Sequence, residues 1–249
     1  MINIVIPMAG AGSRFAKEGY TDPKPLIKIH DLPMIQVVIG NLKTKMECKF
    51  IFICQEEHVI KYGLKEKFNE YAPGSEIIAI NGITEGAACT VLKAESLINN
   101  DTPLMIANSD QYIDIEIDHY LDYMSTKKLE GLIMTMYAND PKWSFIEINE
   151  NDLVTRVVEK EVISNEATVG IYNFIKGKDF VNAAKSMIEN NDRTNNEFYV
   201  APVYNYLIKE GYKVGYYNIG SESNGMYGLG TPEDLNMFIK TPISKSLKR

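Results

Sequence analysis

Small residues and two basic side chains near the N-terminus form the pattern with the clearest chemistry. An apolar run at residues 4–6 leads into Ala9-Gly10-Ala11-Gly12-Ser13-Arg14, and Pro23-Lys24-Pro25 follows. Glycines let backbone N–H groups approach an anion closely, and the start of a following helix favours negative charge. Arg14 and Lys24 add full positive charges. We therefore interpret this segment as a binding site for a polyphosphate.

Lys24 stands between two prolines. Each proline fixes its own φ and favours extended geometry in the residue before it. A stiff backbone restricts where the ammonium can reach, so the sequence predicts a preorganised phosphate contact. An ordinary surface turn is the alternative.

Asp110 follows the apolar run at residues 104–107. Magnesium prefers one or two protein carboxylates together with phosphate oxygens. We therefore predict that Asp110 anchors Mg²⁺, although a carboxylate at this position is also suited to capping a helix.

The elements that must position these residues alternate between strand and helix in the first half of the chain. Hydrophobic periodicity predicts strands at residues 2–7, 49–54, 76–80 and 104–107, and helices at 33–45, 56–71 and 85–98. Such alternation implies parallel strands joined by crossover helices, with ligands at the carboxyl ends of the strands. The loop after residue 7 and residues 108–111 should then share one edge of the sheet.

The second half is richer in strands. We predict strands at residues 132–137, 144–148, 153–159, 168–174 and 213–219, helices at 178–189 and 199–209, and a helix capped by Thr231 with Pro232 in its first turn. We expect an α/β fold in one domain over residues 1–249. Its nucleotide-binding half is residues 1–130 and its acceptor-binding half residues 131–249.

Composition excludes several classes of function. The chain of 249 residues has a net charge of −7, which argues against an electrostatic grip on nucleic acid. Its apolar runs are too short to cross a bilayer, and it opens without the features of a signal peptide, so we expect a cytoplasmic protein without a membrane partner. The sequence contains neither Cys-x-x-Cys nor Gly-x-Ser-x-Gly, which gives no support for a zinc site or a serine hydrolase.

Two other phosphate-binding motifs fit poorly. Gly10-x-Gly12-x-x-Phe15 lacks the third glycine of the dinucleotide fingerprint, and no Gly-Lys-Ser/Thr follows. A nicotinamide cofactor is therefore disfavoured, as is a Walker-type loop.

These motifs together resemble the sugar-nucleotide pyrophosphorylases, which are nucleotidyltransferases of the GT-A-like Rossmann type. The Gly-x-Gly-x-Arg14 opening, Pro-Lys-Pro-Leu26 and Gly230-Thr-Pro-Glu-Asp-Leu235 carry the resemblance. It implies a Rossmann-like three-layer α/β/α sandwich with a mixed, mostly parallel central sheet. It also implies Mg²⁺-dependent transfer of a nucleoside monophosphate to a phosphorylated small molecule, with release of pyrophosphate.

The resemblance assigns roles to individual residues. Arg14 would hold the β- and γ-phosphates, Lys24 the α-phosphate, and Asp110 the metal ion. Nucleotide-binding positions would be Ala9, Gly10, Ala11, Gly12, Ser13, Gly86, Ala87, Ala88 and Ser109. Acceptor-binding positions would be Lys160, Gly170, Tyr172 and Glu197.

Two departures from the family pattern affect this assignment. Gly228 stands where many members have a second metal aspartate, so either one carboxylate suffices or Glu222 or Asn224 substitutes. Trp143-Ser-Phe145 replaces a frequent Tyr-Gly pair, which suggests an unusual acceptor.

Other residues bear on the identity of the base and of the acceptor. Small residues at Ala87 and Ala88 favour a pyrimidine, and similarity to capsule-locus cytidylyltransferases favours CTP over UTP and dTTP. The acceptor would be a sugar 1-phosphate or an amide phosphate such as phosphoglutamine. A GT-A glycosyltransferase or a non-catalytic nucleotide sensor are the alternatives, and exposed apolar surface would allow a homodimer.

Overall fold

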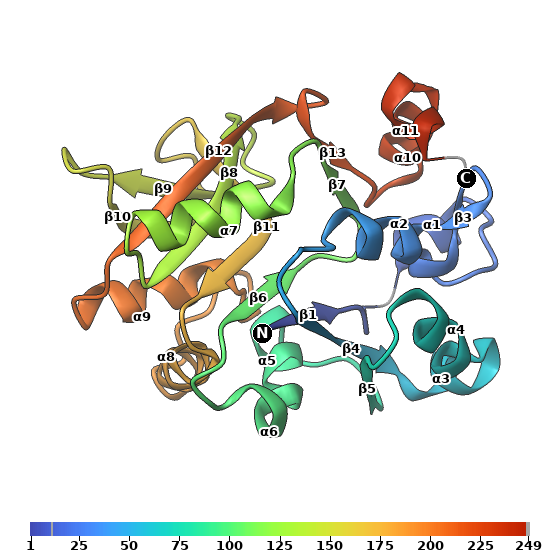
Figure 1. The fold of residues 1–249 in the computed structure, drawn as a ribbon, viewed down its shortest axis with the longest axis horizontal. Coiled ribbons are helices and arrows are strands. Elements are labelled where there is room, and N and C mark those ends of the chain that lie inside the picture. The colour runs from blue at the N-terminus through green and yellow to red at the C-terminus, as the bar shows by residue number, and fades with distance from the viewer. Residues whose placement is uncertain (11, 248–249) are drawn as a thin grey trace.

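A mixed sheet runs through the molecule in the order β5-β4-β1-β6-β11-β8-β12-β13-β7, and β9 and β10 extend it from β11 (Figure 1). The computed structural model describes residues 1–10 and 12–247. In these ranges the strands of the main sheet are β1 (Ile2–Pro7), β4 (Cys48–Gln55), β5 (Glu76–Ile80), β6 (Leu104–Ala107), β7 (Gln111–Ile113), β8 (Gly131–Tyr137), β9 (Ser144–Ile148), β10 (Val154–Glu159), β11 (Glu166–Phe174), β12 (Val214–Glu222) and β13 (Gly225–Gly228). Within the described residues, five of the eight neighbouring pairs along the main order are parallel. The predicted mixed, mostly parallel sheet is confirmed.

Helices cover both faces of this sheet. One face carries α2 (Met34–Asn41), α3 (Glu56–Tyr62), α4 (Leu64–Tyr71) and α7 (Ile117–Thr126), and the other carries α5 (Ala87–Val91), α6 (Glu95–Ile98), α8 (Gly177–Glu189) and α9 (Tyr204–Lys209). Successive side chains of a strand point to opposite faces. Ile4 and Ile6 of β1 accordingly join the first apolar core, and Val5 joins the second. The three-layer α/β/α arrangement follows, with strands from both halves of the chain in one sheet.

Strand β1 lies between β4 and β6 and is parallel to both. Val5 pairs with Ile51 on one side and with Ile106 on the other. The loop after β1 and the residues after β6 therefore emerge at the same edge, as the alternation of strands and helices predicts.

The C-terminal helices return to this edge. A third apolar cluster contains Phe15 of α1 (Ser13–Lys17) and Ile29 of β2 (Lys28–Ile29). It also contains Leu235 and Phe238 of α10 (Pro232–Lys240). Strand β2 pairs with β3 (Leu32–Pro33). Helix α10, followed by α11 (Pro242–Ser246), lies beside α1 and β3 (Figure 1). The predicted cap is confirmed, because the Thr231 side chain accepts a hydrogen bond from the Asp234 N–H at 3.1 Å. This packing holds residues 228–235 near the N-terminal loop.

The three helices predicted in the first half of the chain differ from those observed. The helix predicted at 56–71 is divided into α3 and α4 at Gly63, whose φ of 58° is left-handed. The helix predicted at 85–98 begins at Ala87 and consists of α5, the 3₁₀ turn η2 (Leu92–Ala94) and α6. The helix predicted at 33–45 ends at Asn41, whose side chain instead hydrogen-bonds the backbone of Ile113 in β7.

Candidate active site

Lys24 and Asp110 meet at the carboxyl edge of the sheet. The ammonium of Lys24 donates a hydrogen bond to Asp110 Oδ2 at 2.7 Å, across 86 residues of sequence. The two side chains are 25% and 24% exposed, so the pair is reachable from solvent. The structure thus brings together the lysine and the carboxylate that the sequence assigns to phosphate and to metal.

The backbone at Lys24 differs from the prediction. Lys24 begins the 3₁₀ turn η1 (Lys24–Leu26) and is not extended. The Leu26 N–H donates to the Pro23 carbonyl at 2.8 Å, which closes the turn. Proline is tolerated here because the first turn of a helix does not use its N–H. The two prolines therefore hold Lys24 in a tight turn.

Lys24 also adjoins the glycine loop. A Cβ at Gly12, whose φ is +59°, would lie 3.8 Å from the Cβ of Lys24. Ser13 and Arg14 follow as exposed residues of α1, which has only five residues, so the helix dipole adds little there. Ala11 lies outside the described residues. The phosphate roles of these loop residues stay predictions.

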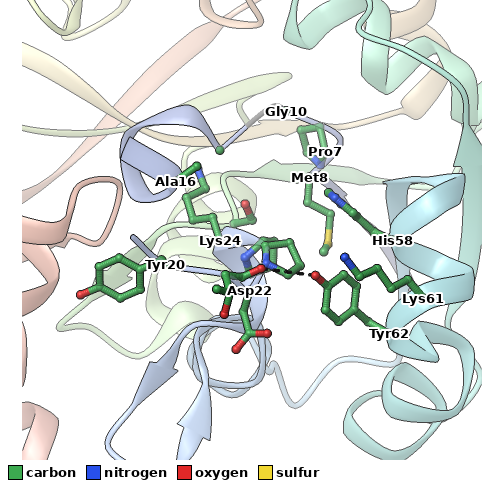
Figure 2. Close-up of a pocket in the computed structure, with 15 residues that line it drawn as sticks. Pro7, Met8, Gly10, Ala16, Tyr20, Asp22, Lys24, His58, Lys61 and Tyr62 are labelled. Carbon is green, nitrogen blue, oxygen red and sulfur yellow. Dashed lines mark hydrogen bonds between the residues drawn. The ribbon is translucent and has the colours of Figure 1, made fainter. Parts of the chain in front are cut away.

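A cavity of about 330 Å³ opens beside this loop (Figure 2). Residues of the loop, the segment 20–25 with Lys24, and Ser109 line one part of it. His58, Lys61 and Tyr62 of α3 line the opposite part, whereas Arg14 is absent from the lining. Sequence reasoning missed the three α3 residues, because no motif marks them and only the fold places α3 across from the loop.

Two backbone groups at the predicted nucleotide-binding positions, the Ala9 carbonyl and the Ala88 N–H, already form hydrogen bonds within the protein. The Gln55 amide donates to the carbonyls of Ala9 at 2.6 Å and Gly82 at 2.9 Å. Ala88 is fully buried, and its N–H donates to the Phe198 carbonyl at 3.0 Å. The Ala88 N–H is therefore already hydrogen-bonded within the protein. The nucleotide-binding roles of Gly86, Ala87 and Ala88 stay predictions.

Gly86 packs so closely against Phe198, in the second half of the chain, that a side chain is excluded. Its φ is +134°, and an added Cβ would overlap the backbone of Phe198. The Phe198 N–H donates to the Glu85 carbonyl at 2.8 Å. The Glu85 side chain also forms an ion pair with Arg193. The start of α5 is thus joined to residues 193–198 of the second half.

A second cavity, of about 280 Å³, lies where the two halves meet. Ala87 and Asn108 of the first half line it, together with Trp143, Gly170 and Tyr172 of the second. Gly170 needs a φ of +80°, and a Cβ there would overlap the Asn108 amide. This cavity contains two of the four predicted acceptor residues.

Lys160 and Glu197 lie near this second cavity. Lys160 Nζ donates to the hydroxyl of Tyr199, a lining residue, at 2.6 Å. That hydrogen bond raises the pKa of Lys160, and the charges of Glu159 and Glu197 act in the same direction. Lys160 therefore stays protonated and is available to an anionic acceptor.

Glu159 contributes a buried carboxyl to the same cavity. It is 8% exposed and accepts a hydrogen bond from the Ser144 hydroxyl. Burial raises the pKa of Glu159, and the Ser144 hydrogen bond and the charge of Lys160 oppose this rise. Ser144 belongs to the Trp143-Ser-Phe145 segment, so this departure from the family pattern changes the lining of the second cavity.

Unpaired polar atoms border the same region. Among the described residues, Gln111 Nε2 and Trp143 Nε1 are buried without a hydrogen-bond partner. Gln111 Oε1 would lie 3.0 Å from a Cβ at Gly170, which places this side chain against the cavity wall. Both atoms are hydrogen-bond donors that the described protein groups leave unpaired.

A metal ion would have one carboxylate in direct reach at this site. No group of three His, Cys, Asp or Glu residues that could hold a metal occurs within residues 1–10 and 12–247. The Glu222 carboxylate is already paired with the Lys142 ammonium at 2.9 Å. The Asp234 carboxylate lies 3.7 Å from the position of a Cβ at Gly228, but it already accepts a hydrogen bond from the Thr231 hydroxyl. Asp110 alone, completed by phosphate oxygens, is a donor set that fits Mg²⁺.

No described helix is long and apolar enough to cross a membrane.

Comparison with known proteins identifies relatives of the chain. The family model described as Nucleotidyl transferase matches residues 4–235. A "Bifunctional protein GlmU" of Methanococcus maripaludis is 26% identical over 176 residues, which are 69% of this chain and 39% of that protein. A mannose-1-phosphate guanyltransferase of Candida albicans is 24% identical over 174 residues, 68% of this chain and 48% of that protein. The chain therefore matches less than half the length of these two curated relatives.

Solved structures share the fold. A nucleoside-diphosphate-sugar pyrophosphorylase from Vibrio cholerae RC9 is 24% identical, with a TM-score of 0.79 and coverage of 96% of this chain and 100% of that one. An inositol-1-phosphate CTP transferase from T. maritima is 16% identical, with a TM-score of 0.70 and coverage of 96% of both chains. At these identities the likeness concerns the fold.

Proposed function

The chain belongs to the nucleotidyl transferase family, and on that premise we propose that it transfers CMP from CTP to a phosphorylated small molecule and releases pyrophosphate. The observation that carries the proposal is the 2.7 Å contact between Lys24 and Asp110, beside the glycine loop and a cavity. A cation for phosphate and a carboxylate for a metal ion are the two groups that such a transfer needs most.

In the proposed reaction, an oxygen of the acceptor phosphate attacks the α-phosphorus of the triphosphate. A new P–O bond forms, the bond between the α-phosphorus and the bridging oxygen breaks, and pyrophosphate leaves with that oxygen. A phosphate dianion is already nucleophilic, so no general base is required. Catalysis is then mainly positioning and charge stabilisation.

The described side chains divide this work. Lys24 contacts the α-phosphate and stabilises the charge that develops there, and Arg14 binds the β- and γ-phosphates. Asp110 would hold Mg²⁺, which when bound neutralises charge on the phosphates. Lys160 binds the phosphate of the acceptor, and Glu197 accepts hydrogen bonds from its polar body. The second cavity orients the acceptor between Gly170, Tyr172 and Glu159.

The substrates are proposed from the resemblance and from the size of one residue. CTP is favoured by the resemblance to capsule-locus cytidylyltransferases and by the small residue Ala87, and an inositol-1-phosphate CTP transferase has the same fold. The acceptor is a sugar 1-phosphate or an amide phosphate of the phosphoglutamine type. The role would be precursor synthesis for a capsule or surface polysaccharide in the cytoplasm, by a monomer or homodimer.

The test is a panel of CTP, UTP, dTTP, ATP and GTP, each with glucose 1-phosphate, mannose 1-phosphate, inositol 1-phosphate or phosphoglutamine, with coupled detection of pyrophosphate. The proposal expects pyrophosphate only when triphosphate and acceptor are both present, and the largest yield with CTP. A glycosyltransferase would release a nucleoside diphosphate from a nucleotide sugar, and a sensor would bind nucleotide without turnover. Either result contradicts the proposal.

A further inference from the structure

We infer that helix α3 forms a second cationic wall of the phosphate site, in which Lys61 and His58 bind the pyrophosphate portion of the nucleotide across the cavity from Lys24. The identity of this anion rests on the proposed function. The cavity and its charged lining are independent of it.

The cavity of about 330 Å³ has two facing sides. The loop at Gly10 and Gly12 and the segment with Lys24 form one side, and α3 forms the other. Figure 2 shows Lys61 and His58 extending from α3 toward the loop. Residues three and four apart on a helix share a face, so His58, Lys61 and Tyr62 reach the same space.

Charge in the cavity favours an anion. No described carboxylate lies within 4.0 Å of Lys61 Nζ, and this ammonium instead stands 5.2 Å from the centre of the Tyr62 ring. Lys24, whose ammonium is paired with Asp110, faces it from the other side, and Asp22 is the acidic residue in the lining. Two lysines and an imidazole donor around one cavity suit a phosphate group, which offers several acceptor oxygens.

The wall is held in place against the loop segment. The Tyr62 hydroxyl donates to the Thr21 carbonyl at 3.4 Å, and Val59, 7% exposed, anchors α3 in the core. The cavity is near the lower end of the range of about 300–1,000 Å³ for small-molecule sites. It therefore suits one portion of a nucleotide, and the contact of Lys24 with Asp110 places that portion next to the proposed transfer site.

The test measures binding of inorganic pyrophosphate to the full chain by calorimetry, without nucleotide. We compare the wild type with Lys61→Gln, His58→Gln and the double variant. Lys65→Gln is the matched control, because Lys65 is exposed on α4, close in sequence, and outside the cavity lining. Lys61→Arg should retain binding, since it keeps the charge. CMP, which lacks the pyrophosphate portion, is the control ligand, and thermal melts check folding.

We expect each single substitution to weaken pyrophosphate binding about tenfold, as for loss of one charge-assisted hydrogen bond, with CMP binding and the Lys65→Gln variant unchanged. Wild-type affinity for pyrophosphate in the double variant would overturn the inference, as would the absence of pyrophosphate binding by the wild type. If pyrophosphate binding depends on Lys61 but no triphosphate is turned over, the proposed function fails and the α3 site stands. If turnover occurs and the double variant still binds pyrophosphate normally, the α3 site fails alone.

Discussion

The ammonium of Lys24 and the carboxylate of Asp110 are 2.7 Å apart although 86 residues separate them in sequence. The contact exists because β1 and β6 are adjacent parallel strands, so the segments that follow them share one edge of the sheet. This contact joins the proposed phosphate-binding side chain to the proposed metal ligand. The proposed function depends on this contact.

Replacing Lys24 by Ala should reduce turnover more than any other single change at the site. Loss of one donor to a transition-state charge costs about 3–4 kcal/mol, or ~10²–10³ in rate. Steady-state pyrophosphate release measures the effect. Lys43→Ala is the control, because Lys43 is an exposed lysine in the segment after α2. A rate within about threefold of the wild type would remove Lys24 from the proposed role.

Asp110→Asn should weaken metal binding and leave the stability of the fold nearly unchanged. The amide keeps the shape and can still accept from Lys24, but it removes the charge that Mg²⁺ requires. Since the pair is about a quarter exposed, its loss should change the free energy of unfolding by less than about 1 kcal/mol. We expect weaker binding of Mn²⁺, as a spectroscopic probe in the presence of CTP, with a nearly unchanged melting temperature. Unaltered Mn²⁺ binding would exclude Asp110 as the ligand.

Gly170→Ala should destabilise the protein and disturb the second cavity. Its φ of +80° disfavours an L side chain, and the added Cβ would overlap the Asn108 amide. Such strain costs on the order of 1–3 kcal/mol. Gly40→Ala is the matched control, because Gly40 lies in α2 with nothing within 4 Å of an added Cβ. Urea unfolding should show a clear loss for the first variant and none for the second; equal midpoints would refute the crowding at Gly170.

Glu159→Gln should stabilise the protein in a pH-dependent manner. Burial raises the pKa of Glu159 in the folded state. The Glu159 carboxyl therefore keeps its proton to a higher pH in the folded state than in the unfolded state. Wild-type stability should fall as pH rises past about 4.3, because an unfolded Glu ionises there. The variant lacks this loss, so its advantage should be absent at lower pH and grow until the folded carboxyl is also ionised.

Melting temperatures between pH 4 and 8 measure this difference. Glu150→Gln, in the exposed 149–152 turn, is the control and should run parallel to the wild type. A Glu159→Gln variant that loses stability as pH rises, relative to the wild type, would contradict the burial argument.

Local sequence patterns predict much of this fold but miss elements where two periodicities meet. The apolar runs of β1 and β6 are unambiguous, so their pairing and the common edge follow. In contrast, Ile113, Ile115 and Ile117 alternate with polar residues as in a strand, yet β7 ends at Ile113 and α7 begins at Ile117. The alternation hides the start of the helix.

Local patterns also fail to predict site residues that belong to no motif. In the sequence, His58 and Lys61 have the pattern of ordinary polar positions on a helix. Only the tertiary packing of α3 places them across the cavity from Lys24. The hydrogen bond from the Ala88 N–H to the Phe198 carbonyl is likewise a long-range contact, which no local pattern predicts. The hydrogen bond between Ser144 and Glu159 links two strands of one hairpin and needs their register.

The most direct test of the central claim is a structure of the protein in complex with Mg²⁺ and the triphosphate that gives the highest pyrophosphate yield. We predict that the α-phosphate lies within hydrogen-bond distance of Lys24 Nζ and that Asp110 binds the metal ion. A triphosphate tail bound away from Lys24, or Asp110 without contact to the metal, would contradict it.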